Sequence, residues 1–232
     1  MLGNSAALYA ASTWILPVLI AVPFHEAAHG FVAHRLGDDT AWRMGRVTFN
    51  PLRHIDPFGT VVLPLLLFIT GGFLFGYAKP VPVNFRALRP PRLGSILVAA
   101  AGPAMNIALA LAAAFLFYAI VYLPPEIGRW TLLCLAHAVE LNIVLAVFNM
   151  LPIPPLDGGR VAVGILPRPL ALPLARLEPY GLLIILGLLF VLPWIGEQVH
   201  LDLDVLRWVL TGPVDYLVNL VAVIAGLGNF FS

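Results

Sequence analysis

Two histidines and a glutamate near residue 25 form the group in this sequence best suited to chemistry. They occur as His25-Glu26-Ala27-Ala28-His29, which fits the pattern His-Glu-x-x-His. On an α-helix, residues four apart share a face with Cβ atoms about 5–6 Å apart, so both imidazoles can bind one zinc ion. Glu26 projects beside this pair, where its carboxylate can accept a proton from water at the metal. The pattern predicts metal-assisted hydrolysis.

A plainer interpretation of this group is two histidines at a helix end near lipid headgroups, with Glu26 extending into water. The surrounding sequence argues against it, because the three ionisable side chains follow a long uncharged run and still lie within helix length of the bilayer. Ionisable groups at membrane depth are costly and usually functional.

A third metal ligand must come from elsewhere, because a catalytic zinc ion typically has three protein ligands and one open position for water. The best candidate is Asp157, in the stretch Asn149-Met-Leu-Pro-Ile-Pro-Pro-Leu-Asp-Gly-Gly-Arg160. Its prolines end the preceding helix, and the two glycines permit a sharp reversal that can aim the carboxylate inward. Alone, an Asp-Gly pair after prolines more often marks a turn, so a turn-forming aspartate is the alternative.

The elements that must position these residues are membrane helices. The chain of 232 residues is 60% hydrophobic and 11% charged, whereas soluble domains contain roughly a quarter charged residues. Four stretches lack Asp, Glu, Lys and Arg, namely 1–24, 57–78, 93–125 and 179–196. Each is near or above the ~20 apolar residues that a membrane-spanning helix needs. We predict an all-α membrane protein, with the lipid bilayer as a partner and no nucleic-acid partner, since no basic stripe is present.

Hydrophobic segments are expected at 7–36, 57–76, 93–122, 131–150, 180–195 and 205–230. The segment 57–76 is interrupted by Pro64 and Gly71-Gly72, and basic residues flank it on both sides. A full crossing would place these two basic clusters in opposite compartments, which the positive-inside rule disfavours. We therefore expect a bundle of five to six transmembrane segments with a short β or re-entrant element after the first helix. A sixth full span is the alternative.

The charge distribution also predicts orientation. If 57–76 re-enters, every Lys and Arg except Arg129 and Arg207 lies on the cytoplasmic side, and the acidic stretch 197–204 lies outside. The N-terminus has no Lys or Arg before its apolar stretch, so we expect a retained helix rather than a cleavable signal. We predict one integral-membrane domain over 1–232, with a catalytic core at about 8–178 and hydrophobic C-terminal helices at about 180–230.

The two main motifs together resemble the site-2 protease family of intramembrane zinc metalloproteases, peptidase family M50. The resemblance rests on His-Glu-x-x-His in an apolar helix, paired with Asn149-x-x-Pro152-x-Pro154-x-Leu156-Asp157-Gly158. Other stretches that resemble the family are Gly45–Pro51, His54–Pro57, Ala78–Asn84 and Ala101–Asn106. The similarity extends over about residues 20 to 180 and is greatest to compact members without PDZ or CBS domains.

The resemblance implies a role for each site residue. His25, His29 and Asp157 would bind one Zn²⁺ per chain, and Glu26 would be the general base and then the proton donor. Asn149 would steady the scissile carbonyl or its oxyanion. The implied function is hydrolysis of peptide bonds in transmembrane protein substrates, within or near the bilayer, as in regulated intramembrane proteolysis. The family's orientation, with the site towards the cytoplasmic face of a plasma or inner membrane, agrees with the charge distribution.

Other polar residues are expected to have supporting roles. Asn106, Glu140 and Asn142 lie in apolar helices, where hydrogen bonds between helices are the commoner role. Asn142 is seven residues before Asn149 and shares its face, which makes it a candidate support for the site. We expect His34, His54 and Asp56 to be interfacial or loop-stabilising.

Two other function classes stay open. A membrane metal transporter could use the same ligands, but it would need a continuous polar path across the bilayer. An inactive relative could bind client helices, although the intact Glu26 argues against it. For a protease, a helical substrate must unwind locally, because its peptide groups are bonded within its own helix. The exposed substrate could pair with a strand edge near 43–50 or with the re-entrant segment.

Overall fold

The computed structural model describes residues 2–63, 65–66 and 76–228, and helices joined by turns and loops make up this part of the chain. Five helical segments within this part of the chain are long and apolar enough to cross a membrane. They are Leu8–Arg35, Pro91–Tyr122, Pro125–Asn149, Arg168–Val199 and Val205–Ile224. The predicted all-α, multi-span architecture is therefore confirmed.

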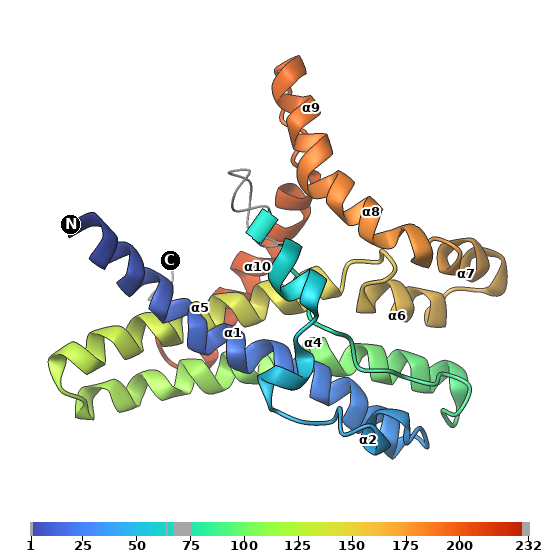
Figure 1. Ribbon diagram of the computed structural model, residues 1–232, viewed down its shortest axis with the longest axis horizontal. Helices are drawn as coiled ribbons and strands as arrows, with labels where there is room; N and C mark the ends of the chain where they lie inside the picture. Colours follow the sequence, from blue (N-terminus) through green and yellow to red (C-terminus); the bar gives the residue numbers. More distant parts are fainter. Residues whose placement is uncertain (1, 64, 67–75, 229–232) are drawn as a thin grey trace.

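Three long helices form the centre of the molecule. Helix α4 (Pro91–Leu116) and α5 (Pro125–Asn149) run side by side in opposite directions, and α1 (Leu2–Arg35) lies across both (Figure 1). A 3-10 turn, Phe117–Tyr122, extends α4 to the Pro124-Pro125 pair that precedes α5. Proline at the first position of α5 suits this reversal, because that position needs no backbone donor.

Small side chains bring the central helices close together. Ala110 and Ala114 of α4 are fully buried and pack against Val139 and Ile143 of α5. Val221 of α10 (Val205–Ile224) closes the same cluster from the other side. In membranes, helices associate mainly through such close packing, because burial of apolar surface from lipid gives no hydrophobic driving force.

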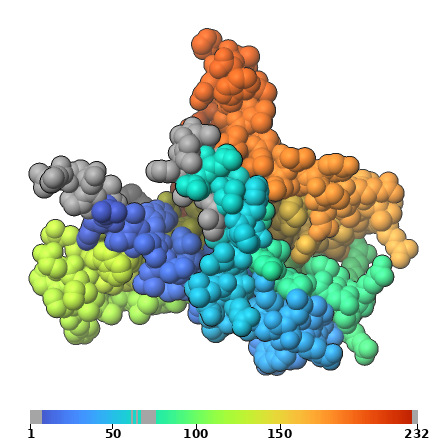
Figure 2. Space-filling view, in the orientation of Figure 1, coloured from blue at the N-terminus to red at the C-terminus, as the bar shows by residue number. Residues whose placement is uncertain are grey.

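The C-terminal third begins with short helices, α6 (Asp157–Ile165) and α7 (Arg168–Ala175). From α7 a helical run continues through α8 (Gly181–Leu186) and α9 (Leu192–Val199), and this run stands out from the central bundle (Figures 1 and 2). It starts well before the predicted 180–195. The prediction followed the uncharged window alone, whereas the helix continues through charged residues.

The expected β element near 43–50 is wrong, because the described residues contain no strand. Helix α2 (Thr40–Arg43) is followed by turns, and the backbone donors there bond locally. Arg46 N–H donates to Ala41 O at 2.9 Å, and Asn50 N–H to Thr48 Oγ1 at 3.2 Å. Gly45, with φ of +61°, turns the chain instead of extending it. Donors used in turns cannot form a ladder.

The predicted re-entrant segment 57–76 is described only in part, since residue 64 and residues 67–75 lie outside the described residues. Its first turn is a π-helix, Pro57–Val62. Beyond the segment, Tyr77 N–H donates to Gly59 O at 3.0 Å and Lys79 N–H to His54 O at 2.9 Å. The chain therefore enters and leaves this segment at adjacent points.

Candidate metal centre

The three residues predicted as metal ligands meet at one point, where two histidines of α1 face Asp157, the first residue of α6. The Nε2 atoms of His25 and His29 are 3.1 Å apart. Asp157 Oδ2 lies 3.2 Å from His25 Nε2 and 3.3 Å from His29 Nε2. All three residues are buried, although Asp157 is far from the histidines in sequence. The proline-rich loop thus delivers a carboxylate to the histidine pair.

Each imidazole is oriented through its other ring nitrogen. His25 Nδ1 bonds to Asn106 Oδ1, and His29 Nδ1 donates to the Val98 carbonyl oxygen at 2.7 Å. A carbonyl oxygen only accepts, so the ring proton of His29 is on Nδ1, and the amide oxygen places that of His25 likewise. Both Nε2 lone pairs are then free for a metal. This is the usual arrangement around metal-binding histidines.

Asp157 completes a set of electron-pair donors that suits a divalent cation. Its Oδ2 is buried and has no hydrogen-bond partner among the described residues. Two imidazoles and a carboxylate match a zinc ion's preferred ligands, so the residues present fit the metal.

A chain of amides connects the site to α5. Asn106 Nδ2 donates to Asn142 Oδ1 at 2.8 Å, and Asn142 Nδ2 donates to Ala138 O at 2.8 Å. Both asparagines are almost completely buried. The expected bonding between helices is present for Asn106 and Asn142, whereas Glu140 is exposed. The contact between Asn106 and His25 was not predicted. A buried amide in an apolar helix needs hydrogen-bond partners, and this need could have pointed to a contact between Asn106 and a polar residue of another helix.

Gly102 on α4 lies directly against the two imidazoles, and sequence reasoning gave it no role. A Cβ at this position would lie 2.4 Å from His29 Nε2 and 2.5 Å from His25 Nε2. Any side chain there would displace the metal-facing atoms. The absence of a side chain lets the α4 backbone approach the site closely.

The loop that carries Asp157 folds tightly on itself, as the prolines and glycines predicted. A Cβ on Gly158 would lie 2.1 Å from Met150 O, and one on Gly159 would lie 2.4 Å from Pro154 N. Only glycine allows the first turn of α6 to pack on this backbone. The packing fixes where Asp157 starts the helix.

Glu26 and Asn149 make contacts outside the ligand cluster. Glu26 is half-buried, and its Oε2 accepts from Val81 N–H at 2.8 Å. Asn149, the last residue of α5, donates from Nδ2 to Leu145 O in its own helix at 3.0 Å. The structure therefore places Glu26 next to the His25 position under the 77–84 loop, and Asn149 at the base of the Asp157 loop.

The remaining polar residues stabilise loops, as expected. His34 pairs with Asp39 at 2.7 Å, and its ring stacks on Trp42. His54 Nε2 donates to Thr48 O at 2.9 Å. Asp56 accepts from two backbone amides at the start of the π-helix.

Comparison with known proteins agrees with this geometry. The profile described as "Peptidase family M50" matches residues 13–129 and 125–192. The chain belongs to peptidase family M50. It is a zinc metalloprotease hydrolase by family, and its five apolar helices make it a multi-pass membrane protein.

Several relatives of this M50 chain carry names of the same kind. "Putative zinc metalloprotease YwhC" of Bacillus subtilis is 37% identical over 77% of this chain and 80% of its own length. "Putative zinc metalloprotease Rip2" of Mycolicibacterium smegmatis is 31% identical over 87% of this chain and 74% of its own length. "Putative zinc metalloprotease MJ0611" of Methanocaldococcus jannaschii is 33% identical over 60% of this chain and 62% of its own length. No solved structure matches significantly.

Proposed function

We propose that this chain is an intramembrane protease of the site-2 type, which hydrolyses peptide bonds of transmembrane protein substrates within or near the bilayer. The observation that carries the proposal is the buried convergence of His25, His29 and Asp157 between helices apolar enough to span a membrane. A hydrolytic centre that lies between membrane-spanning helices has the transmembrane segments of other proteins as its nearest substrates.

His25, His29 and Asp157 would hold one Zn²⁺ per chain. When bound, this ion supplies Lewis-acid chemistry, which makes a water molecule more acidic and polarises a carbonyl group. The protein orients its two imidazoles from α4 through Asn106 and the Val98 carbonyl. Because these bonds hold both rings in position, little ordering is needed for ligation.

Glu26 is the proposed general base. Its place beside His25 on α1 lets the carboxylate take a proton from the attacking water and then give it to the leaving amine. The bond from Val81 N–H holds Oε2, so the direction of the carboxylate is set from outside the helix. Asn149 is proposed to donate to the scissile carbonyl oxygen. Its Nδ2 carries a second proton beyond the one bonded to Leu145 O.

The substrate must reach this site as an extended chain. A helical segment keeps its peptide groups in its own hydrogen bonds, so the bond to be cut is exposed only after local unwinding. Substrates with Gly, Pro or Asn near the cut should therefore be preferred.

We further propose a plasma or inner membrane location with the site towards the cytoplasm. With 57–76 re-entrant, every Lys and Arg except Arg129 and Arg207 lies in a segment on the cytoplasmic side, as the positive-inside rule favours. Re-entry of 57–76 is supported by the bonds from Tyr77 to Gly59 and from Lys79 to His54, which join the two flanks. A straight span would separate its ends by about 30 Å.

The test compares zinc content with cleavage of a transmembrane test peptide by purified protein, with and without a chelator. Glu26→Gln should keep zinc and lose cleavage, because only the proton acceptor is removed. His25→Ala should lose both, because a ligand is removed.

The matched control is His34→Ala, which removes a histidine of the same helix that pairs with Asp39 away from the cluster. It should keep zinc and cleavage. Full activity in Glu26→Gln would exclude Glu26 as the base. Chelator-resistant cleavage would exclude the metalloprotease mechanism itself.

A further inference from the structure

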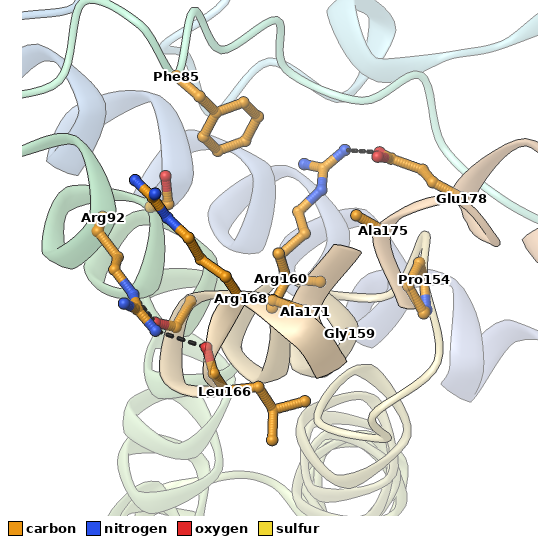
Figure 3. Close-up of a pocket in the computed structure, with 13 residues that line it drawn as sticks. Phe85, Arg92, Pro154, Gly159, Arg160, Leu166, Arg168, Ala171, Ala175 and Glu178 are labelled. Atoms are coloured by element: carbon orange, nitrogen blue, oxygen red, sulfur yellow. Dashed lines mark hydrogen bonds and ion pairs between the residues drawn. The ribbon is translucent and has the colours of Figure 1, made fainter. Parts of the chain in front are cut away.

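A cavity of about 360 Å³ lies beside α6, the helix that begins with Asp157. Three arginines from three helices line it, Arg92 of α4, Arg160 of α6 and Arg168 of α7. In Figure 3, Arg92 and Arg160 flank the hollow on opposite sides, Arg168 extends between them, and Phe85 lies above. The mechanism proposed for the metal centre uses none of these side chains.

The three guanidinium groups differ in the hydrogen bonds and ion pairs that they form. Arg92 donates to the carbonyl oxygens at the end of α6, including Gly164 O at 2.6 Å. Arg160 bonds to Glu178 at 3.0 Å, and its guanidinium lies 5.1 Å from the Phe85 ring centre. Arg168 has no hydrogen bond or ion pair within the described part of the chain. Among the described residues that line the cavity, one carboxylate, that of Glu178, faces three cations, so this lining has an excess of positive charge.

The position of the cavity relative to the membrane indicates what kind of anion it could bind. Arg92 is in the first turn of one membrane-spanning segment, Pro91–Tyr122, and Arg168 is the first residue of another, Arg168–Val199. Both spans begin here, so the cavity lies where helices leave the hydrocarbon layer for the lipid headgroups. Its remaining lining is largely apolar and includes Val163, Ala171 and Ala175. A ligand with an anionic head and apolar tails fits this lining.

We propose that this cavity binds the phosphate headgroup of an anionic phospholipid. Guanidinium groups form paired hydrogen bonds to phosphate oxygens, and basic pockets between membrane helices on the cytoplasmic side recognise such headgroups. The bound phosphate would take the free donors of Arg168 and the remaining donors of Arg92 and Arg160. It would join α4, which orients both histidines, to α6, which begins at Asp157. The binding itself goes beyond the proposed proteolysis and does not depend on it.

The test measures lipid binding to the purified full-length chain in a neutral detergent, by native mass spectrometry. The probes are short-chain phosphatidylglycerol, phosphatidylcholine with the same acyl chains, and inorganic phosphate. We expect phosphatidylglycerol to bind at least about tenfold more tightly than phosphatidylcholine, because the choline cation would be repelled. Arg168→Gln should weaken phosphatidylglycerol binding about tenfold, the usual size of one lost charge-assisted bond.

The matched control is Arg176→Gln, which removes the same charge from the end of α7, outside the cavity lining. It should leave the affinity unchanged. The Arg168 side chain makes no hydrogen bond or ion pair in the described part of the chain, so its variant should fold normally, and an unchanged thermal midpoint checks this. Equal binding of the two lipids, equal loss in both variants, or inorganic phosphate competing as strongly as the lipid would each overturn the proposal.

Discussion

At the scale of single residues, the two histidines depend on a helix that supplies none of the proposed ligands. Asn106 and the Val98 carbonyl, both on α4, set the orientation of the rings on α1. Asn106→Leu removes the partner of His25 Nδ1 and leaves Asn142 without its donor. Zinc affinity should fall about 10–100-fold, as is usual when the partner of a metal-bound histidine is removed. Competition with a chromophoric chelator measures it.

The control for that substitution is Asn219→Leu, an exposed amide on α10 that makes no contact with the cluster in the described part of the chain. Its zinc affinity should match that of the parent chain. A parent-like affinity in Asn106→Leu would show that His25 is oriented by something else.

Gly102 gives a second prediction at this scale. Gly102→Ala adds a methyl group within 2.5 Å of both Nε2 atoms, so the rings or α4 must move. We expect purified Gly102→Ala protein to contain much less zinc and to unfold at a lower temperature. Gly212→Ala on α10, where a Cβ meets nothing within 4 Å, should have normal zinc content. Equal zinc in the two variants would contradict the assigned contact.

The residues of the proposed site could be named from sequence, whereas the residues that support them could not. His25, Glu26 and His29 are close in sequence, and a helix fixes their spacing. Asn106 and Gly102 reach the site only because α4 has a particular rotation and depth against α1. No local pattern encodes that rotation, so the neighbours across helices became visible only in three dimensions.

At the scale of elements, one buried carboxylate joins the end of α1 to the loop before α4. Asp38 accepts from Thr40 N–H at 3.0 Å and Asn84 N–H at 2.6 Å. Burial alone would raise the pKa of Asp38, but hydrogen bonds from Thr40 and Asn84 outweigh burial and lower the pKa below 3.8. A lowered pKa in the folded state means that ionised Asp38 favours folding.

Thr40 Oγ1–H also donates to Asp38 Oδ1 at 2.5 Å, so the carboxylate accepts three bonds. Asp38→Asn should therefore reduce the free energy of unfolding by about 1–3 kcal/mol at neutral pH, because an amide cannot accept all three bonds. The stabilising contribution of Asp38 is complete above the ordinary pKa of 3.8 and is lost as pH falls through the lower folded value. Unfolding in detergent over a pH series measures the difference between the two proteins. A difference that grows on acidification would contradict this sign. Asp39→Asn, at a more exposed ion pair, should cost less.

The end of the predicted segment 93–122 agrees with the structure, where the helical run ends at Tyr122 before the Pro124-Pro125 pair. The next helix was predicted from residue 131, but α5 starts at Pro125. The helical run that starts at Arg168 was predicted to start only at residue 180. The prediction was too late because charged residues outside the hydrocarbon layer can still be helical. The strand expected near 43–50 was wrong, because its amides bond within turns. Apolar content predicts which segments span the membrane, but it does not predict which acceptors the backbone N–H groups of polar loops bond to.

At the scale of the whole molecule, the proposed topology makes a labelling prediction. The native Cys134 is buried and should react slowly, so introduced cysteines can be followed. Arg53→Cys and Lys79→Cys should react with an impermeant thiol reagent from one side of the membrane, because Lys79 N–H donates to the carbonyl oxygen of His54, the residue after Arg53. Leu201→Cys, at an exposed position in the acidic stretch, should react from the opposite side. Labelling of residues 53 and 79 from opposite sides would exclude re-entry.

Residue 81 has a role that belongs to its main chain. Val81 lies between Pro80 and Pro82, whose ring nitrogens bear no hydrogen, so its amide is the sole backbone donor of the three. The Val81 N–H donates to Oε2 of the Glu26 carboxylate. Alanine, leucine or threonine would supply this N–H as well as valine does, and an alanine scan would miss the contact. An amide-to-ester exchange at this bond would remove one hydrogen and keep every side chain, which would isolate how a backbone amide orients the carboxylate proposed as the general base.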